Sequence, residues 1–250
     1  MPFPADREGS ISMKNQVEYR FCRLESVKLA YMDKGEGEAL ILLHGNGENS
    51  GYFQYQIDFF SRYFRVIAVD SRGHGHSERG SGDLTLQRMA DDLLELMNTL
   101  SIEKAHILGF SDGGNIALLF ALQHQDRINK LIVNGANLDS SGVLGIFQTG
   151  VVISHALLTL PARRSPKARL KREILSLMID QPDIPAEQLS KITVPSLVIA
   201  GTKDVIKRKH TETIFASLKN SRLCLIEGDH MIARKCPDEF NKTVYEFLSE

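Results

Sequence analysis

The chain lacks several features that mark whole classes of protein. It has no tryptophan and only three cysteines, Cys22, Cys224 and Cys236, which are widely spaced and odd in number. Secreted disulfide-stapled domains use even sets of cysteines, so these three predict reduced thiols in a cytoplasmic protein. The longest apolar stretches fall short of the ~20 residues that a spanning helix needs, so we expect no membrane insertion.

An excess of charge of either sign is also missing. The 30 Lys and Arg residues are balanced by 31 Asp and Glu residues, which gives a formal net charge of −1. We therefore expect no basic field for nucleic acid and no polybasic segment for an anionic membrane. Residues 1–16 contain no apolar signal-peptide core and are interpreted as a flexible leader, with Met1 and Met13 as alternative starts.

What the chain does contain is an alternation of short apolar runs with helical patterns. Its 250 residues are enough to bury one sizeable core. Buried strands are expected at residues 39–43, 65–69, 105–108, 129–133, 196–200 and 222–226, after two edge strands at 19–25 and 27–33. Helices are expected at 52–62, 85–100, 114–122, 207–218 and 237–248. This rhythm predicts an α/β fold with a mostly parallel sheet covered by helices on both faces.

The rhythm breaks between residues 137 and 195. Residues 143–160 are apolar but interrupted by glycine, and a basic run follows at residues 163–172. We expect a helical insertion over the carboxyl edge of the sheet, where open α/β sheets bind ligands. The core would then comprise residues 17–136 and 196–250. The basic run is interpreted as a solvated helix face rather than a phosphate site.

A G-x-S-x-G motif at residues 109–113 carries the main functional signal. An apolar strand precedes it and an apolar helix follows it, which is the context of a nucleophile elbow. The flanking Gly109 and Gly113 leave room for a sharp turn. The following helix directs its N-terminus at the place where negative charge develops. The motif predicts that Ser111 is a nucleophile.

A serine nucleophile needs a general base and an acid that orients the base. Asp204 follows the apolar strand at 196–200, and His230 follows the strand at 222–226, so the chain order is Ser111, Asp204, His230. Asp229 adjoins the histidine and is expected to point elsewhere. His74 and His76 form an H-x-H pair, but no set of metal ligands stands around them, so no metal site is predicted.

An oxyanion hole is expected from two backbone N–H groups, those of Asp112 and Asn46. Asn46 lies in His44-Gly45-Asn46-Gly47, a loop without the G-K-[ST] ending of a phosphate loop. The Asp112 carboxylate has two open interpretations. It either caps the elbow helix or faces the pocket, where it would attract a substrate ammonium group.

These motifs resemble those of the α/β-hydrolase superfamily across residues 17–250. The resemblance rests on segments 44–47, 70–77, 109–114, 201–204 and 228–230. The Ser111–Gly114 stretch and residues 230–248 resemble the branch of valacyclovir hydrolase and biphenyl hydrolase-like proteins, although the insertion is short and basic for that branch. The resemblance implies an eight-stranded sheet, a helical lid at residues 137–195 and no cofactor.

The predicted function is a serine carboxylesterase that cleaves small-molecule esters through an acyl-enzyme. Candidates to line its acyl pocket are Phe110, Asp112, Leu144, Phe147, Met178 and Met231. Thioesterase, amidase, perhydrolase and carbon–carbon bond hydrolase activities remain alternatives on the same triad, as does a non-catalytic ligand-binding role. Epoxide hydrolases and haloalkane dehalogenases are disfavoured because they have Asp at the position of Ser111. No oligomeric state is predicted.

Overall fold

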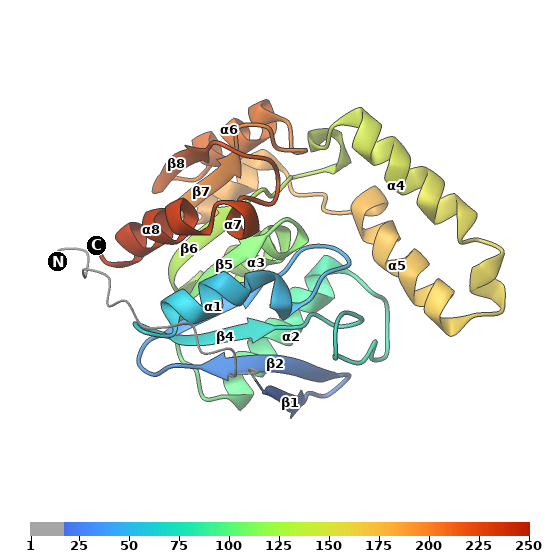
Figure 1. Cartoon of the computed structure of the whole chain (residues 1–250), viewed down its shortest axis with the longest axis horizontal. Helices are drawn as coiled ribbons and strands as arrows, with labels where there is room; N and C mark the ends of the chain where they lie inside the picture. The colour runs from blue at the N-terminus through green and yellow to red at the C-terminus, as the bar shows by residue number, and fades with distance from the viewer. Residues whose placement is uncertain (1–17) are drawn as a thin grey trace.

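The computed structural model describes residues 18–250, which are organised around one eight-stranded sheet (Figure 1). The strand order is β1-β2-β4-β3-β5-β6-β7-β8, and β2 alone runs against the direction of the other seven strands of this sheet within residues 18–250. The predicted mostly parallel sheet is confirmed, whereas the leader predicted at residues 1–16 lies outside the described residues. The strands are β1 Tyr19–Arg23, β2 Lys28–Lys34, β3 Ala39–Leu43, β4 Arg65–Val69, β5 Ala105–Phe110, β6 Ile128–Asn134, β7 Ser196–Gly201 and β8 Ser221–Ile226.

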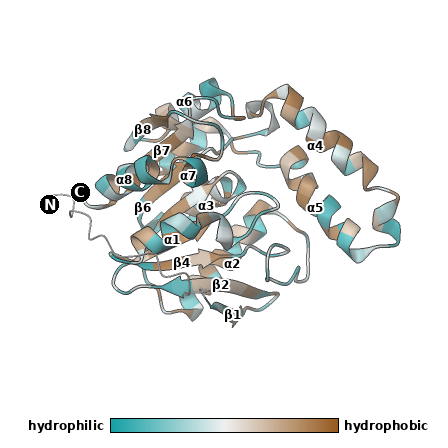
Figure 2. Ribbon diagram, in the orientation of Figure 1, coloured by the Kyte–Doolittle hydropathy of each residue, from teal (hydrophilic) through white to brown (hydrophobic). Residues whose placement is uncertain are grey.

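Helices cover both faces of this sheet. The covering helices are α1 Gln54–Phe60, α2 Leu86–Thr99, α3 Asp112–His124, α6 Arg208–Ser217, α7 Ile232–Lys235 and α8 Pro237–Leu248. Alternate residues of β3 enter two different cores, because successive strand side chains point to opposite faces. Ile41 and Leu43 pack with α2, α3 and α6, while Leu40 and Leu42 pack with α1 and α8. β3 is therefore buried along its whole length, and the central strands carry mostly hydrophobic residues (Figure 2).

The ends of the covering helices follow local sequence signals. Thr85 caps α2 by accepting a hydrogen bond from the Arg88 N–H at 3.0 Å, and α8 begins with Pro237 at its first position. Both helices therefore start within one residue of the expected position. Short 3-10 turns complete the connections, at Ser50–Phe53, Gln125–Arg127, Ser140–Gly142, Pro161–Arg163 and Ala186–Lys191.

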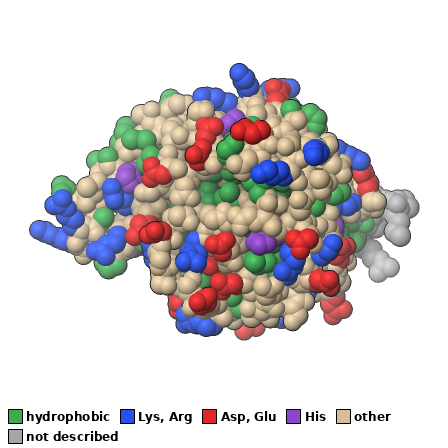
Figure 3. Space-filling model, turned by 180° about the vertical axis from the view of Figure 1, so that it is seen from behind, with side chains coloured by type: hydrophobic (Ala, Val, Ile, Leu, Met, Phe, Trp, Pro, Cys, Tyr) green, Lys and Arg blue, Asp and Glu red, His purple; other side chains and the backbone are tan. Residues whose placement is uncertain are grey.

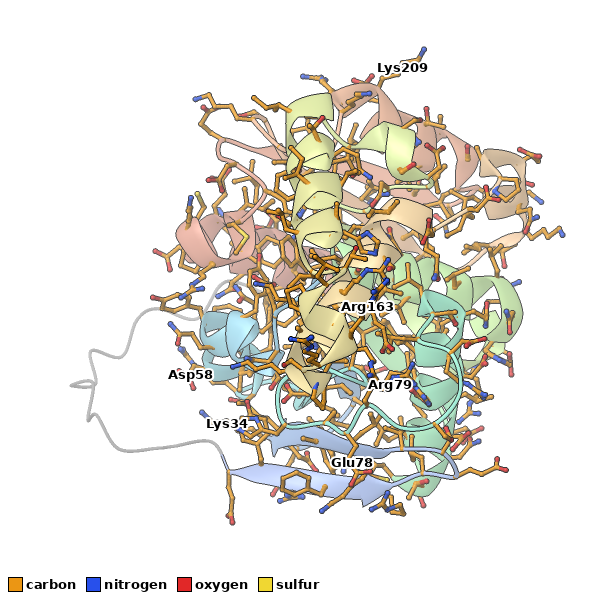
Figure 4. The ribbon with its side chains drawn as sticks, turned by 90° about the vertical axis from the view of Figure 1, so that its right-hand side faces the viewer. Lys34, Asp58, Glu78, Arg79, Arg163 and Lys209 are labelled. Atoms are coloured by element: carbon orange, nitrogen blue, oxygen red, sulfur yellow. The ribbon has the colours of Figure 1, made fainter. Side chains whose placement is uncertain are left out.

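The helical insertion lies between β6 and β7 and forms a hairpin of α4 (Gly145–Leu157) and α5 (Pro166–Asp180). The hairpin projects beyond the carboxyl edge of the sheet, on the right of Figure 1. Gln148 of α4 donates to the Met178 carbonyl of α5 at 3.0 Å, which joins the two helices. An ion pair of 2.9 Å between Arg79 and Glu173 ties α5 to the core (Figure 4).

The loop after β4 depends on a buried ion pair. The Arg72 guanidinium donates from Nε and Nη2 to the two carboxylate oxygens of Asp92 on α2. Arg72 is completely buried and Asp92 is 2% exposed. Arg72 also donates to the Ser81 carbonyl and the Ser26 hydroxyl. A charge this deep requires its partner, because an unpaired buried ion costs several kcal/mol.

Replacing Asp92 by alanine is therefore expected to lower the free energy of unfolding by about 3–5 kcal/mol, because Arg72 would stay buried and unpaired. Urea denaturation measures this loss. The matched control is Glu212→Ala, which removes an exposed pair with Arg208 on α6 and should cost no more than about 0.5 kcal/mol. Equal losses for the two variants would contradict this account of the loop.

Candidate active site

Ser111 occupies a sharp turn between β5 and α3. Its backbone has φ 54° and ψ −120°, a conformation that is strained for a residue with a side chain. A Cβ atom on Gly113 would lie 2.0 Å from the Leu43 carbonyl oxygen, and one on Gly109 would lie 2.2 Å from the Gly113 oxygen. Both positions therefore require glycine, as the sequence predicted.

The three predicted triad residues meet at this turn. His230 Nε2 lies 3.0 Å from Ser111 Oγ, and His230 Nδ1 lies 2.6 Å from Asp204 Oδ1. Asp204 follows β7 and His230 follows β8, so parallel strands deliver both to the same sheet edge. With Nδ1 donating to the carboxylate, Nε2 is left to accept the serine proton. Asp229 instead accepts from the Met231 N–H at 2.9 Å and pairs with Lys235.

The loop after β3 packs directly on the elbow. A Cβ on Gly45 would lie 3.1 Å from the Ser111 Cβ, so the backbone of this loop approaches the nucleophile closely. The Asn46 side chain donates to Asp112 Oδ2 at 2.9 Å and to the Ile174 carbonyl of α5 at 2.8 Å. Asn46 therefore joins the loop, the elbow helix and the hairpin.

His44 holds this loop in place. Its Nδ1 lies 2.8 Å from the Gly45 carbonyl oxygen, and its Nε2 accepts from the Ser71 N–H at 3.0 Å. A neutral ring satisfies both bonds. Burial, reinforced by the nearby His74, accordingly lowers the pKa of His44 to about 4.

His74 and His76, which form the H-x-H pair, contact oxygen atoms of their own loop. His74 Nδ1 lies 3.0 Å from the Arg72 carbonyl oxygen, and His76 Nδ1 lies 3.3 Å from Asp70 Oδ2. Within residues 18–250, no group of three His, Cys, Asp or Glu side chains is arranged to hold a metal ion.

A cavity of about 330 Å³ opens beside Ser111 and His230. Five predicted pocket residues line it, namely Phe110, Asp112, Phe147, Met178 and Met231. Leu144 does not, and that prediction is wrong. Its N–H donates to the Val205 carbonyl at 2.8 Å at the base of the hairpin, and its side chain is 40% exposed. The preceding Val143 lines the cavity instead.

Six further residues of the cavity wall are not among the predicted site residues. These are Glu48, Asn137, Val143, Gln181, Val205 and Ile206. Glu48 follows the 44–47 loop and belongs to no motif, so only its place in the fold reveals it. Its Oε2 is buried and makes no hydrogen bond with the described residues.

The lining is acidic. Glu48, Asp112 and Asp229 contribute to it, and no Lys or Arg does among the described residues. Burial raises the pKa of Glu48 to about 7 and that of Asp112 to about 6. Ser111 caps no N–H of α3 with its side chain, and the Asp112 carboxylate accepts from the side-chain amides of Asn46 at 2.9 Å and Asn115 at 3.5 Å. Asp112 lines the cavity, as the interpretation that it faces the pocket requires.

Comparisons with known proteins agree with this geometry. A family model described as alpha/beta hydrolase fold matches residues 38–151. The human serine hydrolase BPHL is 30% identical, over 90% of this chain and 84% of that protein. A putative carbamate hydrolase RutD of a Caulobacter species is 29% identical, over 85% and 91%. The enol-lactonase structure of Burkholderia xenovorans superposes with a TM-score of 0.78 at 26% identity, over 92% and 100%.

The buried Asp112 carboxylate generates a stability prediction. Burial raises its pKa to about 6 in the folded chain, from an ordinary 3.8. The ionised form therefore destabilises the fold, and this loss of stability begins above pH ~4 and is complete above pH ~6. Asp112→Asn should raise the unfolding free energy by up to about 3 kcal/mol at pH ~8 and by little at pH ~4. Urea titrations at both pH values measure the difference. A gain that is independent of pH would contradict the assignment.

Proposed function

Since the chain belongs to the α/β-hydrolase superfamily, in the branch of serine hydrolase BPHL, we propose that it is a serine hydrolase that cleaves small carboxylic esters. The observation that carries this proposal is the unbroken hydrogen-bonded line from Asp204 through His230 to Ser111. That line ends at the wall of a cavity large enough for a small ester.

In the proposed reaction, Ser111 Oγ attacks the ester carbonyl while His230 Nε2 takes the serine proton. Asp204 holds the ring with Nδ1 protonated and stabilises the imidazolium that forms. The Ile206 N–H donates to Asp204 Oδ1 at 2.8 Å and fixes this carboxylate. His230 then protonates the departing alcohol, and a water activated by the same ring releases the acid.

The negative charge of the tetrahedral intermediate needs donors at its oxygen. We assign these to the backbone N–H groups of Asn46 and Asp112, the latter at the positive end of α3. Close packing of Gly45 on Ser111 supports this assignment, because it brings the loop backbone beside the elbow. The donors are backbone groups, so they survive side-chain substitution at both positions.

The helical hairpin is proposed to act as a lid. Phe147 from α4 and Met178 from α5 line the cavity, so the hairpin sets its size and apolar character. The size of the cavity suits a short acyl chain. The carbamate, lactone and other activities in the relatives' names belong to those proteins. The cytoplasmic location stays a prediction.

Ser111→Ala should abolish ester hydrolysis, with kcat/KM falling by at least about 10⁴-fold, because no other group replaces the nucleophile. The assay uses p-nitrophenyl esters from acetate to decanoate, whose rate profile also sizes the pocket. Ser190→Ala is the matched control and should keep the wild-type rate, because Ser190 is an exposed serine that does not line the cavity. A folded Ser111→Ala protein that retained the wild-type rate would refute the mechanism.

The Asp112 carboxylate should make the reaction sensitive to the charge of the substrate. An ionised Asp112 facing the cavity should favour amino-acyl esters over their des-amino analogues by about tenfold or more in kcat/KM, as a charge-assisted hydrogen bond would. The preference should grow from about pH 5 to about pH 7, because Asp112 ionises across that range.

Asp112→Asn should remove both the preference and its pH dependence, while hydrolysis of the des-amino ester continues. Glu48→Gln is the matched control, because Glu48 is the other wall carboxyl with a raised pKa. Equal kcat/KM for the two substrates in the wild type would exclude recognition of an amine at this site.

A further inference from the structure

The helical hairpin exposes hydrophobic side chains that the fold does not cover. Of the nine exposed large hydrophobic residues among residues 18–250, seven lie between positions 144 and 160. These are Leu144, Ile146, Phe147, Val152, Ile153, Leu157 and Leu160. Such a concentration on one segment marks an interaction surface, whereas single exposed hydrophobic residues are ordinary.

The exposed residues occupy a defined side of α4. Gln148 and His155 face α5, where they contact the Met178 carbonyl and the Ser176 hydroxyl. Helical spacing places Ile146, Ile153 and Leu157 on the opposite side. They are 87%, 54% and 72% exposed. No helix or strand within the described residues packs outside this side of α4, and the helix carries hydrophobic residues along its length (Figure 2).

Positive charge gathers at the tip of the same hairpin. The chain has no acidic residue between Asp139 and Glu173, but has six Lys and Arg residues there. Arg163, Arg169 and Arg172, with Thr159, line a recess of about 400 Å³. Blue side chains accordingly cover the protruding end at the left of Figure 3, and Arg163 lies on the hairpin end that faces the viewer in Figure 4.

Among residues 18–250, the arginines of this recess form no ion pair, although Arg169 Nε donates to the Ala162 carbonyl at 3.4 Å. Arg172 Nε is buried and has no hydrogen-bond partner among the described residues. No carboxylate lines the recess. Guanidinium groups arranged in this way suit phosphate oxygens, which they bind through parallel N–H donors.

We propose that this hairpin surface (Ile153, Leu157, Leu160, Arg163, Arg169 and Arg172) binds the face of an anionic phospholipid membrane. The aliphatic side chains enter the boundary between headgroups and acyl chains, and the arginines bind lipid phosphates. Binding of this kind lies in the plane of the interface. It is therefore compatible with the finding that no helix within residues 18–250 is long and apolar enough to span a bilayer.

Charge argues for a membrane rather than a second copy of the chain. Two hairpins that paired through this surface would bring their cations together with no acidic residue from the same stretch between them. An anionic bilayer offers the opposite charge and an apolar layer beneath it. The basic run, interpreted from sequence as a solvated helix face, thus acquires a partner. The proposal is independent of the proposed hydrolysis.

Vesicle co-sedimentation of the full chain tests the proposal. The wild type should bind phosphatidylcholine vesicles containing about 30% phosphatidylglycerol at least about tenfold more tightly than phosphatidylcholine alone. Binding should weaken from about 0.1 M to about 1 M salt, where the screening length falls from ~10 Å to ~3 Å. Leu157→Ser/Leu160→Ser and Arg163→Gln/Arg169→Gln should each reduce binding about tenfold.

Lys209→Gln/Lys219→Gln is the matched control, since it removes two exposed cations away from the hairpin and should leave binding unchanged. Thermal melts check that every variant is folded. Two results would overturn the proposal: no preference of the wild type for anionic vesicles, or wild-type binding by the arginine variant. A solution dimer that Leu157→Ser/Leu160→Ser dissociates would assign the surface to a second copy and also overturn it.

Discussion

The site depends on one strained backbone conformation, that of Ser111. A residue held with positive φ outside the usual regions costs about 1–3 kcal/mol, which the surrounding structure must offset. The Ser111 N–H donates to the Asn134 carbonyl at 2.8 Å, and the Ser111 carbonyl accepts from Asn115 at 3.0 Å. Because Gly113 lets α3 pack on Leu43, the sheet and the helix together hold the hydroxyl above the sheet edge.

The sequence predicted those parts of the site that follow recognisable strand ends. Ser111, Asp204 and His230 come directly after apolar strands, and a parallel sheet brings such positions together whatever their separation in sequence. Leu144 and Glu48 could not be placed in this way. The Leu144 backbone N–H bonds to the carbonyl of Val205, sixty-one residues later, and Glu48 reaches the cavity wall through the fold of a loop.

The structure separates two environments of opposite charge. The cavity wall holds Glu48 and Asp112, whose pKa values burial raises to about 7 and about 6. The hairpin tip holds arginines with no acidic partner in the recess they line. The net charge of −1 does not reveal this division, because it sums all 30 basic and 31 acidic residues of the chain. The net charge therefore does not predict the charge of local surfaces. The distribution of charged residues along the hairpin sequence predicts it better.

The side-chain amide of Asn46 links the hairpin to the residue beside the nucleophile. Asn46 Nδ2 donates both to Asp112 Oδ2 and to the Ile174 carbonyl of α5. The Ile174 carbonyl therefore helps to orient the amide that binds the Asp112 carboxylate. That amide favours the ionised form of Asp112, against the burial that disfavours it. The carboxylate beside the nucleophile is therefore bound by an amide whose orientation α5 helps to fix, although Ile174 contributes only its backbone carbonyl.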